Sequence, residues 1–269
     1  MSIWRTSASQ LEQAIFCGEQ WKRVHIDKQP RPPGIALHVG TSLHKVSEYN
    51  FTIKMATGED EPLDVLRDVA RDGYIYKLRD EGVYLSRDET SRKTELLNEG
   101  LTQAVSLSES FRNDFAPMIQ PIAVEHEVKL LDEEIEVSWL GYVDLEDGTT
   151  ARDLKSASRA WSESQADAST QATLYPHLIE ATTGKRPERF VFNIFRKLKG
   201  NAEHQEIVTT RDESDWQALR RKAAHVKKMI DAGLLPPADQ SSWRCSEAGC
   251  GYFSDCKFIS ERRRRLPNR

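Results

Sequence analysis

A chain of 269 residues can form one large domain or two small ones with a substantial buried core. Apolar residues make up 38% of it and charged residues 30%, and its longest apolar runs are far shorter than the roughly 20 residues that cross a bilayer, which argues against a membrane protein. The net charge of −4 argues against a protein that coats DNA non-specifically, but it does not exclude one that holds nucleic acid in a local basic groove.

The N-terminal residues and the cysteine content bear on the cellular compartment. No charged start followed by an apolar stretch is visible, so we expect no signal peptide and a cytoplasmic location. Four cysteines in that compartment are not expected to form disulfides, because thiols are kept reduced there.

Residues 1–120 are predicted to be mainly helical. Ser7 can cap a first helix with Gln10 completing a capping box, and the prolines between Lys28 and Gly34 break the helical pattern. Further helices are predicted from Thr41 or Ser42 to Gly58, from Pro62 to about Asp80, and from about Asp88 to Asn113.

After Pro121 the apolar pattern changes from helical to alternating. Strands are predicted at Ile122–Leu131, Ile135–Glu146, Thr149–Ser156, Arg189–Lys197 and His204–Thr210, and helices at Ser164–Thr182 and Glu213–Ala232. We therefore expect an α/β fold, a central mixed sheet flanked by helices, within one domain over residues 1–269. Residues 121–211 would form the sheet core, and residues 212–269 the last helix, a cysteine-rich segment and a basic tail.

The dipeptide Asp147-Gly148 between two predicted strands is a strong hairpin signal. As a two-residue loop it places Asp144, Asp153 and Lys155 on one face of the sheet, together with Tyr142. The two aspartates then become diagonal neighbours, about 7–8 Å apart at the backbone, and their oxygens can converge on one cation.

Two carboxylates on one sheet face repel each other, which drives one of them toward protonation unless a cation neutralises their charge. Hard oxygen ligands favour Mg²⁺ or Mn²⁺, and the lysine could orient a water or stabilise negative charge on a phosphate. A solvated hairpin face with a salt bridge is the alternative interpretation.

Two helical patterns add candidates to this cluster. His44 lies in the segment GTSLH on a predicted helix, although a lone histidine among seven is more often structural. Gln171 and Tyr175, four residues apart, can hold the lysine or a phosphate oxygen, or simply pack as a polar residue beside a half-buried aromatic.

Taken in order, GTSLH, GYVD (Gly141–Asp144), DLK (Asp153–Lys155) and the pair Gln171 and Tyr175 resemble the RecB-like branch of the PD-(D/E)xK nucleases. The resemblance implies a restriction-endonuclease-like core and metal-dependent cleavage of DNA. It implies catalytic roles for Lys155, Asp153, Asp144, Gln171 and Tyr175. It also implies metal binding by His44, Asp144, Asp153 and the backbone carbonyl of Leu154, and Glu125 is a weaker candidate for a second metal or its waters.

The cysteines form a second pattern, in which Cys17 stands alone and Cys245, Cys250 and Cys256 follow the spacing C-x4-C-x5-C. This arrangement resembles the iron–sulfur staple of the CRISPR-associated RecB-like exonucleases, which implies a 4Fe–4S cluster. The first gap is two residues longer than in that family, which weakens the assignment of Cys245. Four thiolates suit zinc equally well, and free buried cysteines are the remaining alternative.

Basic and aromatic residues suggest where DNA could lie. The tail Arg262–Arg265 with Lys257 is one candidate, and a helical patch is another, formed by Arg220, Arg221, Lys222, Lys227 and Lys228. Trp161 could stack on a base or pack locally. We predict an exonuclease acting on single-stranded DNA or DNA ends, in recombination, repair, or phage or CRISPR DNA processing. A catalytically silent DNA-binding module and a restriction-like endonuclease are the alternatives.

Overall fold

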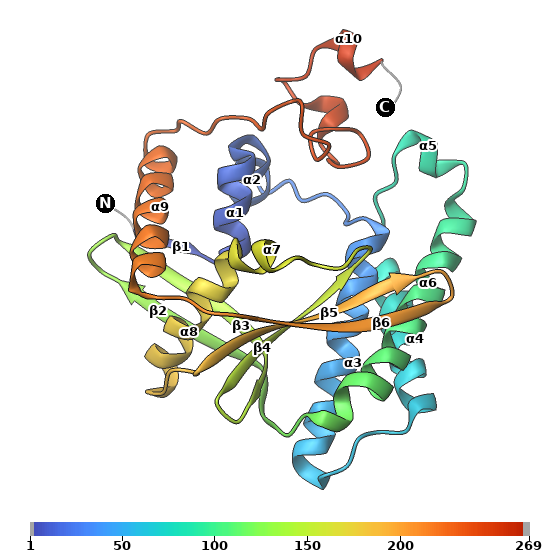
Figure 1. Cartoon of the computed structure of the whole chain (residues 1–269). Helices are drawn as coiled ribbons and strands as arrows, with labels where there is room; N and C mark the ends of the chain where they lie inside the picture. Colours follow the sequence, from blue (N-terminus) through green and yellow to red (C-terminus); the bar gives the residue numbers. More distant parts are fainter. Residues whose placement is uncertain (1–2, 266–269) are drawn as a thin grey trace.

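A single six-stranded sheet forms the centre of the molecule in the computed structural model, which describes residues 3–265 (Figure 1). The strand order is β1–β3–β4–β5–β6, and β2 pairs with β3. Pairs β1–β3 and β4–β5 are parallel and the others are antiparallel. The strands are β1 (Trp4–Thr6), β2 (Pro121–Asp132), β3 (Val137–Asp147), β4 (Thr150–Ala157), β5 (Arg189–Leu198) and β6 (Asn201–Thr209).

Helices flank both faces of this sheet, which confirms the predicted α/β class (Figure 1). The long helices are α1 (Ala8–Phe16), α2 (Gly18–His25), α3 (Ile35–Thr57), α4 (Leu63–Glu81), α6 (Lys93–Ser110), α8 (Thr170–Thr183) and α9 (Glu213–Asp231). Shorter turns are α5 (Arg87–Thr90), a π-helix at Phe111–Phe115, a 3-10 turn at Ala116–Met118, α7 (Glu163–Asp167), a 3-10 turn at Phe253–Asp255 and α10 (Glu261–Arg264). Within residues 3–265, none of these helices is long and apolar enough to cross a membrane.

Each face of the sheet has its own apolar core. Helices α1, α8 and α9 cover a core around the fully buried Trp139. Helices α3, α4 and α6 cover a second core, in which the rings of Phe51, Phe111 and Phe115 meet edge to face at 5.2–5.9 Å. Burial of this apolar surface fixes α3 and α8 on opposite faces of β3 and β4.

Helix α3 begins at Ile35, six or seven residues before the predicted start at Thr41 or Ser42 and directly after the prolines and Gly34. The hydroxyls of Thr41 and Ser42 do not cap a helix start. They donate instead to the carbonyls of Leu37, one turn earlier, and Ala70 on α4. Serine and threonine are common in both roles, so the sequence pattern alone does not separate them.

Other differences come from contacts between distant residues. The helix predicted at Ser164–Thr182 is divided into α7 and α8, because Arg211 donates hydrogen bonds to the carbonyls of Ala166 and Asp167 and ends α7 there. The helix predicted from Asp88 is likewise divided into α5 and α6. Strand β1 was not predicted, and three residues are too few to show an alternating pattern.

Candidate active site

The candidate active site lies where β3 and β4 stop pairing. The ladder between them includes only Leu145–Asp147 of β3, and beyond it the strands separate. In the gap, Oδ2 of Asp144 accepts a hydrogen bond from the backbone N–H of Leu154 at 2.7 Å. The carboxylate thereby replaces a backbone partner and is held, 8% exposed, between the two strands.

The hairpin turn that sets this geometry starts one residue later than predicted, at Gly148-Thr149. Asp147 pairs with Thr150 on β4 and also belongs to the ladder with β2, so it does not leave the sheet to form the loop. The predicted register is therefore wrong. In the observed register, continued by one residue, Asp144 is level with Asp153 rather than diagonal to it.

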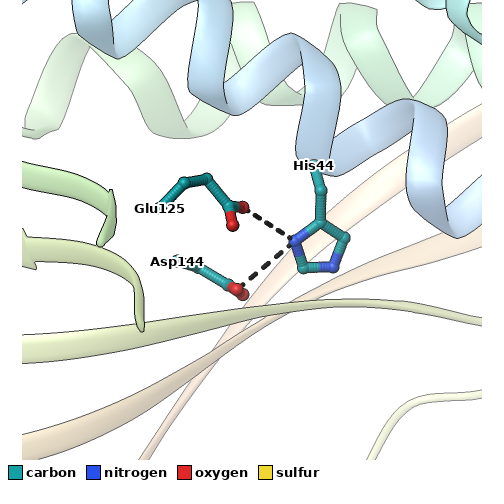
Figure 2. A group of neighbouring side chains, drawn as sticks. All are labelled: His44, Glu125 and Asp144. Carbon is teal, nitrogen blue, oxygen red and sulfur yellow. Dashed lines mark ion pairs between the residues drawn. The ribbon is translucent and has the colours of Figure 1, made fainter. Parts of the chain in front are cut away.

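Three side chains from three elements converge beside this gap (Figure 2). Nδ1 of His44 on α3 lies 3.5 Å from Oε1 of Glu125 on β2 and 3.4 Å from Oδ1 of Asp144 on β3. Within residues 3–265 this is the one group of three histidine, cysteine or acidic residues whose ligand atoms all lie within 4.8 Å of one another. The group matches the size of a cation site.

Glu125 reaches the group from a strained backbone. The pairs on either side of it place Glu125 opposite Asp144 in the β2–β3 ladder, but its φ is +45°. A left-handed conformation costs a residue with a side chain of the order of 1–3 kcal/mol, and such strain gathers at functional sites. The strained backbone therefore supports a functional role for Glu125 in this group.

A second set of contacts is centred on Lys155 at the end of β4. Its Nζ lies 2.8 Å from Oδ2 of Asp153 and donates to Oε1 of Gln171 on α8 at 2.7 Å. The amide of Gln171 in turn donates to Oδ1 of Asp153 at 3.0 Å and to the hydroxyl of Tyr175 at 3.3 Å. Gln171 and Tyr175 thus hold the lysine and the aspartate in one fixed arrangement.

Charge is concentrated in this region. Burial opposes protonation of His44, but hydrogen bonds and attraction from Asp144 and Glu125 outweigh it and raise the pKa of His44 to about 10. Burial raises the pKa of Asp153 to about 6 against the attraction of the Lys155 ammonium, and repulsion from Asp144 adds to the rise. A site that holds a proton this strongly has a negative potential that attracts cations.

The donor atoms fit a hard divalent cation. Carboxylate oxygens and one imidazole nitrogen suit Mg²⁺ or Mn²⁺. Oδ2 of Asp153 is buried and, although it contacts Lys155 Nζ, accepts no hydrogen bond of ordinary geometry. Such an oxygen has a lone pair available for a further ligand. The role of the Leu154 carbonyl stays a prediction.

The residues proposed to contact DNA are mostly engaged elsewhere. Arg220 binds Asp132 at 2.6 Å, Lys227 binds Asp231 at 2.7 Å, and the ring of Trp161 lies 5.1 Å from that of Phe192, against the core. In the basic tail, guanidiniums donate to backbone carbonyls of the cysteine segment: Arg264 to Cys256, and Arg263 to Cys245 and Gln240. These contacts give the tail a structural role in holding that segment.

The four cysteines gather where the C-terminal segment lies against α2. Burial raises the pKa of the Cys250 thiol, and the charges of the other three raise it further, so all four sulfurs lie within electrostatic reach: Cys17, Cys245, Cys250 and Cys256. All four are free and partly exposed.

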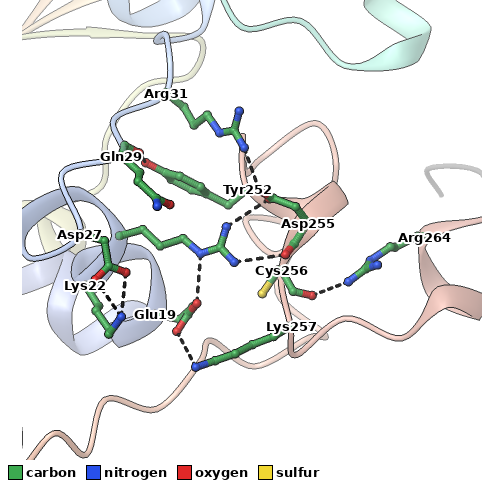
Figure 3. A network of polar contacts seen from close by, with 11 residues as sticks. Glu19, Lys22, Asp27, Gln29, Arg31, Tyr252, Asp255, Cys256, Lys257 and Arg264 are labelled. Carbon is green, nitrogen blue, oxygen red and sulfur yellow. Dashed lines mark hydrogen bonds and ion pairs between the residues drawn. The ribbon is translucent and has the colours of Figure 1, made fainter.

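Ion pairs dock this segment onto α2 independently of any metal (Figure 3). Arg23 lies 3.0 Å from Glu19 and 3.2 Å from Asp255, and Lys257 lies 3.4 Å from the buried Glu19. The guanidinium of Arg23 also lies 5.4 Å from the centre of the Tyr252 ring. Sequence reasoning missed these residues, because nothing in a charged helix turn shows which of its charges meets a segment 232 residues away.

Gly141 of GYVD also has a role that the sequence did not explain. A β-carbon at this position would lie 2.9 Å from Cε1 of Tyr175, closer than real contacts allow. The missing side chain therefore lets α8 approach β3 closely enough to bring Tyr175 and Gln171 to the site. A glycine inside a predicted strand is the one signal that pointed to such a close approach.

Comparisons with known proteins bear on the family and the fold of the chain. The family model of the PD-(D/E)XK nuclease superfamily matches residues 5–257. A crystal structure of a candidate exonuclease from Eubacterium rectale is similar with a TM-score of 0.54 and 10% identity, covering 89% of this chain and 86% of that one, which shows a shared fold. The structure of SSO0001 matches with a TM-score of 0.36 and 12% identity over 93% of each chain. No curated protein matches the sequence. Because the family model covers nearly all of it, the chain belongs to the PD-(D/E)XK nuclease superfamily.

Proposed function

We propose that the protein is a metal-dependent nuclease that hydrolyses DNA phosphodiester bonds, as an exonuclease on single strands or ends. The observation that carries the proposal is the convergence of His44, Glu125 and Asp144 beside the linked pair of Asp153 and Lys155. Recombination, repair, and phage or CRISPR DNA processing are the biological settings that this activity fits.

His44, Asp144 and Asp153 would hold Mg²⁺ or Mn²⁺ with the carbonyl of Leu154, and Glu125 would hold a second ion or its waters. When bound, such an ion polarises the phosphate and favours ionisation of a water. The burial of Asp144 and Asp153, at 8% and 1% exposed, supports this assignment, because two buried carboxylates are costly without cations beside them.

Lys155 is the residue that we propose to act on the reacting groups. Burial opposes its charge, but attraction from Asp153 and Asp144 raises its pKa, so it stays an ammonium. An ammonium can orient the attacking water and stabilise the charge that grows on the phosphate. Gln171 is the positioning residue, because its amide oxygen accepts from Lys155 and its amide nitrogen donates to Asp153.

A catalytically silent module is the less favoured alternative, because a protein that only binds DNA gains nothing from a costly cluster of this kind. Incubation of the protein with end-labelled single- and double-stranded DNA in Mn²⁺, Mg²⁺ or chelator separates the possibilities. We expect metal-dependent release of short products from ends. Cleavage inside a circular single strand would instead indicate an endonuclease, and binding without any cleavage would indicate the silent module.

We also propose that the four cysteines hold a 4Fe–4S cluster rather than zinc. The thiols of Cys17, Cys245 and Cys256 all lie within electrostatic reach of Cys250, which brings a complete set of four thiolate ligands to one place. Four thiolates are the usual ligands of such a cluster. The arrangement of one N-terminal cysteine with a C-terminal trio supports the cluster, whose role would be to link the N-terminal helices to the C-terminal segment.

A further inference from the structure

One face of the sheet beside the candidate metal site is uncovered. In β2, Glu127 and Lys129 are exposed while Val128 between them is buried. In β3, Gly141 faces α8, so Tyr142 points to the opposite face, which is the face of Asp144. In β1, Trp4 packs against the core on the α8 side of the sheet, where its ring meets that of Trp21, so Arg5 lies on the uncovered face. We call this surface the open sheet face; it comprises Arg5, Glu127, Lys129, Ser138, Leu140 and Tyr142.

Tyr142 is the large exposed side chain of this surface. Its side chain is 51% exposed, and its hydroxyl donates to Oε2 of Glu127 at 2.8 Å. It precedes Asp144 by two residues on the same strand and face, which places the two Cα atoms about 7 Å apart. An aromatic ring is thus held beside the site, although the core makes no use of it.

Two basic side chains, one paired with an acid and one without an ion pair, continue the surface away from the site. Lys129 pairs with Glu127 at 2.5 Å and so neutralises the acid nearest the ring. Arg5 pairs with Ser138 in the β1–β3 ladder, and within residues 3–265 its guanidinium has no ion-pair partner. Aromatic rings beside lysine and arginine are the combination that binds unpaired nucleic-acid strands, by stacking and by phosphate contact.

We propose that the open sheet face receives an unpaired DNA strand, with one base stacked on Tyr142 and the following phosphates near Lys129 and Arg5. This inference rests on the proposed nuclease function, since it is the scissile phosphate at Asp144 that fixes where the strand begins. Bases inside a duplex have both faces covered by their neighbours, so the surface selects single strands or frayed ends.

The first test measures binding of a fluorescently labelled single-stranded oligonucleotide in chelator, so that no cleavage interferes. Tyr142→Ala should weaken binding by about 5-fold to about 150-fold, the range for loss of one base–aromatic stack. Tyr142→Phe keeps the ring and should bind nearly as the wild type does. Tyr76→Ala removes another exposed tyrosine, 63% exposed on α4, and should leave binding unchanged. Equal affinities for Tyr142→Ala and Tyr76→Ala would overturn the proposal.

The second test places a single abasic nucleotide at successive positions from the end of the oligonucleotide. With the wild type, one position should lower the affinity as strongly as Tyr142→Ala does, and with Tyr142→Ala that same position should have no further effect. Fully additive losses would also overturn the proposal. The proposed function fails separately: a protein that never cleaves in Mn²⁺, but shows this coupling in chelator, binds the strand here without being a nuclease.

Discussion

Lys155 contacts both Asp153 and Gln171, and its role in cleavage can be tested by substitution. Lys155→Ala removes the ammonium that we expect to orient water and to stabilise the phosphate, so cleavage should fall by about 100-fold or more. The fold should persist, because the core packs without this side chain. Lys77→Ala, which removes a half-buried lysine of α4 that pairs with Glu81 away from the site, is the matched control. Wild-type rates in Mn²⁺ from cleanly folded Lys155→Ala protein would refute the assignment.

His44 and His38 lie on the same helix and allow a matched comparison. His44→Ala should reduce the cleavage rate sharply and weaken the response to Mn²⁺ at least about tenfold, with little change in DNA binding. His38 is buried and hydrogen-bonded to the carbonyl of Gly82 at 2.8 Å. His38→Ala should therefore cost about 1–3 kcal/mol of stability and leave the metal response unchanged. If His44→Ala behaves like His38→Ala, then His44 only fills space.

For single residues, the sequence indicated which side chains lie close together but not which contacts they make. The motifs predicted that His44, Asp144, Asp153 and Lys155 lie together, and in the structure they lie around the gap between β3 and β4. The clamp of Gln171 on Asp153 depends on the tertiary position of α8, and the strained backbone at Glu125 depends on β2 and β3 together. Neither has a local signature.

Among the elements, the close approach of α8 to β3 brings Gln171 and Tyr175 to Asp153 and Lys155. Gly141→Ala would push a methyl group against the ring of Tyr175 and should lower the stability by about 1–3 kcal/mol, as overpacking does. It should also displace Gln171 and so lower activity even in protein that remains folded. Thermal melts and single-turnover rates measure the two effects. An unchanged melting temperature and rate would show that α8 does not depend on this contact.

The elements themselves were largely predictable, and their exact ends were not. Alternation and helical spacing gave the five long strands and most helices within a few residues. The hairpin turn was misplaced because the two-residue rule considers one pair of strands, whereas Asp147 is held by β2 as well as β4. Neighbouring strands therefore overrode a local turn preference.

For the molecule as a whole, the cysteines yield the clearest test. Anaerobically purified protein should be brown, with iron and acid-labile sulfide near four per chain, the composition of a 4Fe–4S cluster. Replacing Cys17, Cys250 or Cys256 with alanine should bleach the protein and destabilise it, because the tie between distant segments is lost. If Cys245→Ala keeps the colour, another group is the fourth ligand. A colourless protein with one zinc per chain would rule out the cluster, but a metal would still link the N-terminal helices to the C-terminal segment.

The polar contacts that hold the C-terminal cysteine segment in place could not be predicted from the sequence. Tyr84 donates to the carbonyl of Glu247, and Arg87 binds its carboxylate at 2.7 Å, so the segment touches the start of α5 as well as α2. These partners are about 160 residues apart in the chain. Spacing of cysteines suggests a ligand set, but it does not show which surface the segment lies on.

The docking of the C-terminal segment onto α2 also sets an order of events during synthesis. Strand β1 and helix α2 are translated well before their partners, because β1 pairs with β3 and Gly18 at the start of α2 hydrogen-bonds to Pro236. Helix α2 acquires its last ion pairs only when Asp255 and Lys257 have been translated. A nascent chain interrupted before those residues would contain every candidate nuclease residue, from His44 to Tyr175, but not the ion pairs that dock the cysteine segment onto α2. The contacts of α2 with this segment are in this way formed after the candidate nuclease residues have been made.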